Sequence, residues 1–420
     1  MHKGGGWGGI RTPEALARPP VFKTGAFNHS ATHPCKSSNA SATEIYSDFR
    51  RPRLLPTVRT RGSDLSGALA WPMIAIIGNQ PRVVPSMDQS VKTAYRPKPE
   101  VLRRFPDISG NAVNGLGEHA FRQPKPIFWR DPDTIAHGPL QQLFYEWSER
   151  VAQYRKVTSK LAGARGPAEL DPVAPTREQD TPENWAARVK DFALAHEADL
   201  VGIAPASSDW VFDDSTVDGD WIVVLGVAMD RDALAKLPPE PPDLSSADEV
   251  SRQYNRAART SKAVTNWIRN RGWPAEAQTG PSAGSAQLIP PAIAAGLGQL
   301  GKHGSVINDT YGAAFRLSAV YTDLPLVADT PRDFGVDDFC ASCRVCTNLC
   351  PPDAIFETKQ WVRGVQKWYV NFDQCIPYFI DTQGCGICIA ECPWSRDGVA
   401  PRLAAKMRRR RQREGTAVAS

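Results

Sequence analysis

The most constraining feature of this sequence is a dense cluster of cysteines near its C-terminal end. The 420-residue chain has nine cysteines, and eight of them lie between Cys340 and Cys392. No cysteine occurs between Cys35 and Cys340. A disulfide framework spreads its cysteines so that they staple a whole domain, whereas a short cluster like this one is typical of a metal site in a reducing compartment.

The spacing within the cluster predicts two iron–sulfur centres. The run from Cys340 to Cys350 reads C-x2-C-x2-C-x3-C-P, which is the pattern of a bacterial two-cluster ferredoxin. In that pattern the fourth cysteine binds the neighbouring cluster. A second run, from Cys385 to Cys392, is one cysteine short, and Cys375 supplies it. We therefore expect one 4Fe-4S cluster on Cys340, Cys343, Cys346 and Cys392, and another on Cys350, Cys375, Cys385 and Cys388.

The alternative for these cysteines is a pair of structural zinc sites. Zinc sites show two separated C-x2-C pairs rather than three cysteines in a two-residue cadence followed by Cys-Pro. The spacing therefore favours iron–sulfur clusters. Two neighbouring clusters of this kind pass single electrons, so we expect a redox function.

Composition and charge limit the remaining possibilities. With 41% hydrophobic and 23% charged residues, the chain has the balance of a globular protein with several domains. Residues 1–86 hold 11 Lys and Arg against 4 Asp and Glu, which leaves 39 against 41 in the remainder. Bulk charge thus gives no support for a nucleic-acid or membrane-surface role. The longest apolar stretch, Gly67–Ile77, is interrupted by Pro72 and is too short to span a bilayer.

Residues 1–86 are expected to be a disordered or wrongly assigned leader. They are rich in Gly, Pro, Ser, Thr and Arg without a helical or strand period. The stretch Gly8–Thr32 is similar to the peptide obtained by translating a transfer-RNA gene, so we expect the true start at Met87, with Met73 second. A genuine disordered extension is the alternative. Arg50-Arg51 lies far from the apolar stretch, which Pro72 interrupts, so we expect a cytoplasmic protein, with export by a twin-arginine signal as the alternative.

The rest of the chain predicts a mixed α/β fold of the α+β kind. The expected helices are Leu140–Lys160, Pro182–His196, 246–271 and Pro291–Leu297, and the expected strands are Ala198–Ala204, Asp220–Val227, Trp273–Gln278 and Phe315–Thr322. These elements give an N-terminal extension over 87–180, an α/β domain over 181–330, the cysteine domain over 331–400 and a basic tail over 401–420.

Several motifs carry a family resemblance. The run Ala295–Gly304, then Tyr311-Gly312, Arg316 and Thr322–Leu326, resembles corrinoid-dependent reductive dehalogenases, as does the closing run Cys385–Trp394. The sister family of epoxyqueuosine reductases shares this layout. Its Gly-Lys-His/Asn turn is similar to Gly301–His303, and its isolated Cys-Ile-x-Tyr is similar to Cys375–Tyr378. The resemblance covers about residues 180–400.

The resemblance implies a fold, a cofactor and a set of site residues. It implies a nitroreductase-like domain that binds a cobalamin-type corrinoid base-off, without a protein ligand to cobalt, next to the ferredoxin domain. The corrinoid would meet the backbone at Gly296, Gly298, Gly301 and Gly304. Tyr254 matches the tyrosine that donates a proton in dehalogenases, and Lys302 and Arg316 are candidate cations to stabilise its tyrosinate. The structural alternatives are a core tyrosine, a surface turn lysine and an outward-facing strand arginine.

The function that follows is a cytoplasmic, non-respiratory, reductive dehalogenase-like oxidoreductase. Its substrate would be a small organohalide or similar electrophile, and its electrons would come from an external ferredoxin, flavodoxin or reductase. One alternative is an epoxyqueuosine reductase-like enzyme, whose catalytic aspartate has no counterpart in residues 274–301. The Arg408–Arg411 tail is then the remaining nucleic-acid signal, and we do not expect transfer RNA as a partner. A second alternative is a ferredoxin-type electron carrier without catalysis.

Overall fold

The computed structural model describes residues 95–158, 170–279 and 284–418, all within one of the two units into which the chain divides. The predictions made for the leader 1–86, including a start at Met87, lie outside these ranges. Among the described residues, no helix is both long and apolar enough to cross a membrane.

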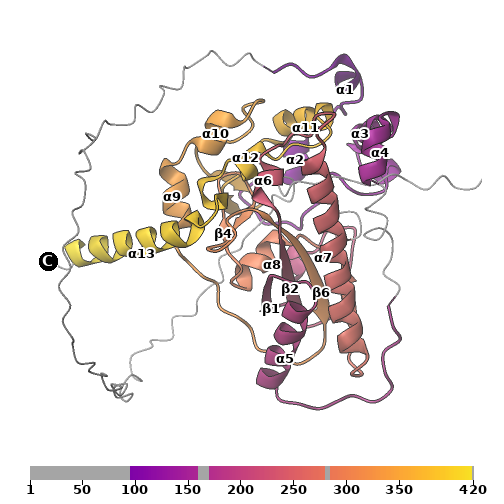
Figure 1. The fold of residues 1–420 in the computed structure, drawn as a ribbon, viewed down its shortest axis with the longest axis vertical. Coiled ribbons are helices and arrows are strands. Elements are labelled where there is room, and N and C mark those ends of the chain that lie inside the picture. The colour runs from indigo at the N-terminus through magenta and orange to yellow at the C-terminus, as the bar shows by residue number, and fades with distance from the viewer. Residues whose placement is uncertain (1–94, 159–169, 280–283, 419–420) are drawn as a thin grey trace, which may run out of the picture. The chain divides into compact units, whose positions relative to one another are not determined.

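A four-stranded antiparallel sheet forms the centre of the α/β domain (Figure 1). Its order is β1 (Leu200–Pro205), β2 (Trp221–Ala228), β6 (Phe315–Thr322) and β3 (Ala275–Gln278). The long central strands β2 and β6 are buried on both faces, which is why both read as nearly continuous apolar runs.

Helices cover the two faces of this sheet. Helix α5 (Pro182–Ala195) and the second half of α7 (Ser245–Arg269) share one apolar core with the sheet, and α8 (Ile289–Ala294) lies in the core on the other face. Thr181 caps α5 by accepting a hydrogen bond from the Asn184 N–H, and Pro182 occupies the first helical position. The structure thus confirms the mixed helix and sheet class, and the helices and strands expected between residues 181 and 330 lie within a few residues of their predicted bounds.

Helix α7 connects the sheet with the cysteine-bearing half of the chain. Its buried stripe recurs every three or four residues and includes Val250, Tyr254, Val264 and Ile268. Val250 and Tyr254 lie in a different apolar core from Val264 and Ile268. Figure 1 shows α7 running along the sheet and on towards α2 and α11.

The N-terminal described segment joins that second core. It contains α1 (Pro99–Arg103), α2 (Gly110–Asn114), α3 (Gly138–Arg150) and α4 (Ala152–Thr158). The single helix predicted over Leu140–Lys160 is wrong, because Val151 is extended and separates α3 from α4. Phe144 of α3 stacks on Phe379 of α11 with ring centroids 5.3 Å apart. Residues before position 180 therefore help to build the core that surrounds Tyr254.

The C-terminal part consists of short helices, one hairpin and a long final helix. These are α9 (Val336–Ser342), α10 (Val345–Leu349), β7 (Gln360–Val362), β8 (Val365–Lys367), α11 (Phe372–Asp381), α12 (Ile387–Ala390), the 3-10 helix η5 (Pro393–Ser395) and α13 (Val399–Val418). The predicted basic tail is thus helical as far as it is described.

Candidate iron–sulfur and active site

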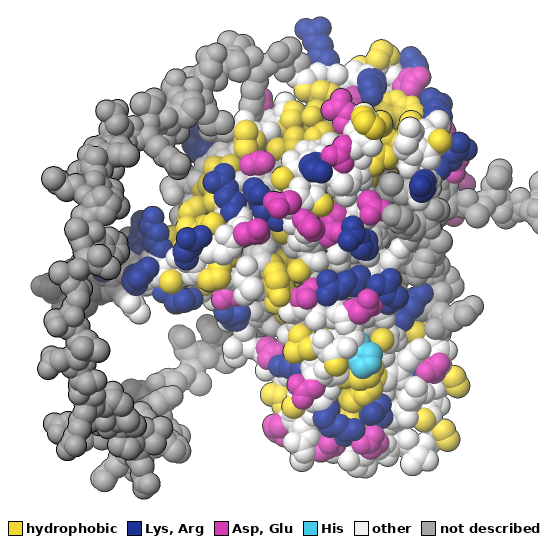
Figure 2. All heavy atoms as spheres, viewed as in Figure 1, with side chains coloured by type: hydrophobic (Ala, Val, Ile, Leu, Met, Phe, Trp, Pro, Cys, Tyr) yellow, Lys and Arg dark blue, Asp and Glu magenta, His cyan; other side chains and the backbone are white. Residues whose placement is uncertain are grey.

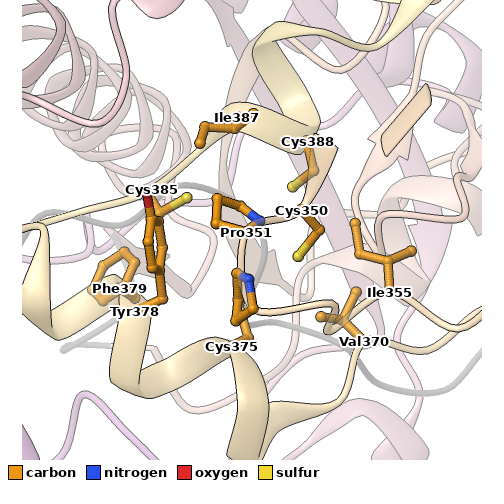
Figure 3. A pocket seen from close by; sticks show the side chains of 11 residues that line it. Cys350, Pro351, Ile355, Val370, Cys375, Tyr378, Phe379, Cys385, Ile387 and Cys388 are labelled. Carbon is orange, nitrogen blue, oxygen red and sulfur yellow. The ribbon is translucent and has the colours of Figure 1, made fainter. Parts of the chain in front are cut away.

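Four cysteines that the spacing assigns to one cluster line a single pocket. We call Cys350, Cys375, Cys385 and Cys388 the second cysteine set. The pocket has about 420 Å³ of empty volume, and its other walls are mainly apolar side chains such as Ile355 and Val370 (Figure 3). Burial raises the pKa of Cys385 to about 12 and raises the pKa values of Cys375 and Cys388 as well. Converging thiols in an apolar pocket are the donor set that a 4Fe-4S cluster requires.

The other four cysteines also approach one another. We call Cys340, Cys343, Cys346 and Cys392 the first cysteine set. Burial raises the pKa of Cys392, and the neighbouring thiols of the same set raise it further. Helix α9 supplies Cys340, α10 supplies Cys346, and η5 begins directly after Cys392. Cys343 is partly exposed, whereas the other three are buried.

Neither cysteine set is arranged to bind a single metal ion. Among the described residues, no three His, Cys, Asp or Glu side chains are placed to hold one metal ion. Thiolates on a single zinc lie about 2.3 Å from the metal, while a cubane spreads its ligands over several irons. The preference for 4Fe-4S clusters therefore rests on the cysteine spacing.

Lys302 lies at the first cysteine set. It follows β4 (Gln299–Leu300), and its side chain is only 2% exposed. Its Nζ donates to the carbonyl oxygen of Cys343 at 2.9 Å and lies 5.0 Å from the Trp368 ring centroid. The surface-turn alternative for Lys302 is therefore wrong. The structure brings this cation to a cysteine set rather than to the Tyr254 hydroxyl.

Packing within the chain explains several glycines of the Ala295–Gly304 run. A Cβ on Gly296 would lie 2.5 Å from the carbonyl oxygen of Thr330, and one on Gly298 would lie 2.3 Å from that of Ile307. A Cβ on Gly301 would meet the Ile307 side chain at 2.6 Å. Gly304 has φ +77°, which favours glycine in the turn before β5 (Val306–Ile307). Folding alone therefore accounts for these residues, without a macrocycle beside them.

Tyr254 and Arg316 form a buried pair. Arg316 Nη1 donates to the Tyr254 hydroxyl oxygen at 3.1 Å, and the guanidinium carbon lies 4.3 Å from the ring centroid. Tyr254 is 6% exposed and Arg316 is 5% exposed. The outward-facing alternative for Arg316 is therefore wrong, because β6 is covered on both faces. The sequence analysis assigned both residues to one site, and the structure places them in contact.

The Arg316 guanidinium keeps unused donors. Its Nε and Nη2 groups have no hydrogen-bond partner among the described residues. Burial lowers the pKa of Arg316, while Tyr254 and the buried carboxylate of Glu249 raise it. A buried donor without a partner costs about 1–3 kcal/mol, so these groups are suited to an acceptor from a bound ligand.

Glu249 is a site residue that the sequence analysis missed. It is 1% exposed and accepts hydrogen bonds from the Asp230 N–H at 2.7 Å and the Gln253 amide at 2.9 Å. The sequence held one signal for it, since Glu249 and Gln253 form a polar i, i+4 pair next to Val250 and Tyr254 on the apolar stripe of α7. The Glu249 Oε2 also pairs with Arg252 Nη2 at 3.2 Å, and the carboxylate charge raises the pKa of Arg316.

The Tyr254 pair and the second cysteine set adjoin one apolar core. That core contains Tyr254, Phe379 and Ala390, and Cys375 and Cys385 pack against it. An electron acceptor beside Tyr254 would therefore lie on the side of the second cysteine set. Cys340 and Cys392 of the first set lie in another core, and Cys346 shares a third core with Cys350 of the second set.

Comparisons with known proteins agree with this arrangement. Residues 339–395 match the family described as the 4Fe-4S dicluster domain. The chain is 28% identical over 265 residues to a tetrachloroethene reductive dehalogenase of Sulfurospirillum multivorans, covering 50% of this chain and 51% of that protein. It is 33% identical over 113 residues to an epoxyqueuosine reductase of Cyclobacterium marinum, covering 25% and 36%. The chain spans about half the length of the reductive dehalogenases it matches.

A solved structure supports the fold. A catabolic reductive dehalogenase aligns with a TM-score of 0.56 at 21% identity, covering 70% of this chain and 45% of that one. The fold and the cysteine sets thus define a mixed α/β domain joined to a 4Fe-4S dicluster domain. Within that class, the chain is related to the reductive dehalogenases and also to the epoxyqueuosine reductases, which confirms the predicted resemblance.

Proposed function

We propose that this protein is a corrinoid-dependent iron–sulfur oxidoreductase that reductively removes halide from a small organohalide or a similar electrophile. The observation that carries the proposal is the buried Tyr254–Arg316 pair next to the second cysteine set. The similarity to tetrachloroethene reductive dehalogenases supports it. So does the likeness in fold to a solved reductive dehalogenase that is described as B12-dependent.

A pocket close to this pair suits part of a corrinoid. It is open to solvent on one side and is lined by residues that include Met229, Tyr311, Ala314 and Ser395. Met229 and Ala314 also belong to the core around Tyr254. We assign the corrinoid to this side of the pair, with the unused Arg316 donors available to an acceptor. When bound, the clusters supply single electrons and the corrinoid supplies the metal centre at which the carbon–halogen bond breaks.

Tyr254, supported by Arg316, provides the proton that the reaction requires. The net change is R–X + 2e⁻ + H⁺ → R–H + X⁻, so one proton must reach the carbon that loses halide. The Tyr254 hydroxyl holds that proton in a site screened from water by the surrounding apolar core. Arg316 Nη1, 3.1 Å away, stabilises the negative charge that develops on the tyrosine oxygen. The charge of Glu249, which is ion-paired with Arg252, also raises the pKa of Arg316.

The test compares two tyrosine-to-phenylalanine variants. Reconstituted protein is given a chemical reductant and a panel of halogenated aromatic and aliphatic compounds, and halide release is measured. Tyr254→Phe should lower turnover by about 10²–10⁴-fold, since it removes a positioned proton donor. Tyr321→Phe is the matched control, because Tyr321 lies on β6, the strand of Arg316, and its hydroxyl is buried without a partner among the described residues. Equal turnover in the two variants would remove the role of Tyr254.

The similarity to epoxyqueuosine reductases supports a second candidate. The acid in the segment 274–301 is Glu276 on β3, and burial raises the pKa of its carboxyl above the ordinary value. A carboxyl group with a raised pKa can hold a proton for an acid-catalysed step. This candidate predicts that the protein binds transfer RNA and restores queuosine in a deficient strain, and absence of both would exclude it.

A further inference from the structure

Helix α13 has two opposite faces of different character. Ala400, Ala404 and Met407 follow an i, i+4, i+7 pattern and are at most 4% exposed. One turn further along the same face, Arg411 pairs with Asp333 at 2.8 Å and with Asp338 at 2.6 Å. This buried face fixes α13 against the rest of the domain.

The opposite face of α13 is basic and exposed. Arg402, Lys406 and Arg409 lie two positions after the members of the buried face, which is about 200° around a helix. All three side chains are exposed, and none forms an ion pair with an acid among the described residues. We call these three residues the basic face of α13. Figure 2 shows Lys and Arg side chains gathered along this helix, at the left of the view.

Helix α13 packs on the elements that carry the first cysteine set. Its neighbours include α9, which contains Cys340, and η5, which follows Cys392. Ala400 and Ala404 lie in the same apolar core as these two cysteines. Cys343, at the end of α9, is the partly exposed member of the set. The basic face therefore lies on the helix that packs beside a cluster site with one partly exposed ligand.

The two cysteine sets thus differ in what surrounds them. The second cysteine set adjoins the core of Tyr254, where the proposed reaction consumes electrons. The first cysteine set is carried by elements on which α13 packs, and Cys343 is its partly exposed member. Electrons entering at the first set and leaving from the second would travel from solvent to the buried site.

We propose that the basic face of α13 docks a small acidic one-electron carrier, a flavodoxin or a ferredoxin, next to the first cysteine set. The carrier loses one electron, and the cluster on Cys340, Cys343, Cys346 and Cys392 gains it. The inference deepens the proposed function, since it names the donor surface. Charge complementarity favours a protein donor, because opposite charges steer encounter and raise association rates. The basic face is local, since residues 87–420 as a whole carry slightly more acidic than basic groups.

The test measures how fast a protein donor reduces the clusters. The full chain, reconstituted with iron and sulfide, is mixed anaerobically with flavodoxin hydroquinone or with reduced ferredoxin, and bleaching of the cluster absorbance is followed. The triple variant Arg402→Glu, Lys406→Glu and Arg409→Glu should be reduced at least about tenfold more slowly at low ionic strength. Added salt should slow the wild type and leave the variant little changed. Reduced methyl viologen is a small cation, so it should reduce the triple variant at least as fast as it reduces the wild type.

A matched control reverses three cations on other elements. Lys125, Lys236 and Arg259 have side chains 54–56% exposed and lie outside α9, η5 and α13. Reversing these to Glu gives the same charge change and should retain nearly the wild-type rate with both donors. Equal slowing in the two triple variants would show an effect of net charge and would overturn the docking surface.

Two further outcomes would also overturn the proposal. One is an unchanged reduction rate in the α13 variant. The other is loss of transfer-RNA binding in that variant with donor reduction intact, which would assign the basic face to nucleic acid.

The readout needs neither corrinoid nor organohalide. Absence of dehalogenation together with a slowed donor reaction would therefore count against the proposed function alone.

Discussion

Replacing Lys302 by methionine tests whether a buried charge sets the potential of the first cluster. The Lys302 side chain is 2% exposed, and its ammonium group donates to the Cys343 carbonyl at 2.9 Å. Burial raises the pKa of Cys340 to about 12 and that of Cys346 to about 11, while the charge of Lys302 lowers both. Methionine keeps an unbranched apolar side chain and removes the charge. Because reduction adds a negative charge to the cluster, the variant should be harder to reduce.

The expected size follows from Coulomb's law. Two unit charges 4 Å apart interact by about 4 kcal/mol at an effective dielectric constant of 20, and by about 2 kcal/mol at twice that separation. In a one-electron couple about 1.4 kcal/mol corresponds to about 59 mV, so the midpoint potential should fall by roughly 100 mV. The shift should be confined to one of the two clusters.

Redox titration followed by electron paramagnetic resonance measures this shift. Lys302→Arg keeps the charge and should restore most of the potential. Lys359→Met is a matched control, since Lys359 lies 5.6 Å from the centroid of the same Trp368 ring but is 35% exposed and paired with Asp337 at 2.7 Å. A Lys302→Met potential equal to that of the wild type, or more positive, would refute the reasoning.

Three further predictions concern stability. Gly312→Ala should lower the thermal midpoint and the iron content, because Gly312 has φ +58° and a Cβ there would lie 2.2 Å from the carbonyl oxygen of Trp394, two residues after Cys392. Phe379→Ala should destabilise the protein by about 3–5 kcal/mol, measured by denaturant unfolding, and should release iron from the second set. Burial lowers the pKa of His137 to about 4. The contribution of the neutral imidazole to the free energy of unfolding is therefore complete above pH 6.5. It should fall by about 1.4 kcal/mol per pH unit on acidification towards pH 4. His137→Phe should reduce that slope, and an unchanged slope would contradict this account.

The cysteine ligand sets were predictable because spacing alone determines them. Eight cysteines divide into two sets without remainder, and the second set converges on one pocket. The strand Phe315–Thr322 has the predicted bounds, since its apolar and β-branched residues lie between loop segments. The Tyr254–Arg316 contact followed from the family resemblance, which assigns both residues to one site.

Other features depend on long-range packing, which local periodicity does not encode. Nothing in the sequence near Phe144 indicates that it stacks on Phe379, more than 200 residues away. Lys302 lies in the turn between β4 and β5 and has the sequence context of a surface turn residue. Only the approach of α9 and Trp368 buries it. The apolar pattern also gives no indication that the N-terminal helix is interrupted at Val151, because the pattern continues across that residue.

The most direct test of the central claim is the metal content of the reconstituted full chain. The protein is loaded anaerobically with iron, sulfide and hydroxocobalamin, and iron, cobalt and the corrinoid spectrum are measured. The account predicts about eight irons per chain from two 4Fe-4S clusters, with about one cobalt in a base-off corrinoid. Eight irons without bound cobalt would leave a dicluster electron carrier and would contradict the catalytic roles proposed for Tyr254 and Arg316.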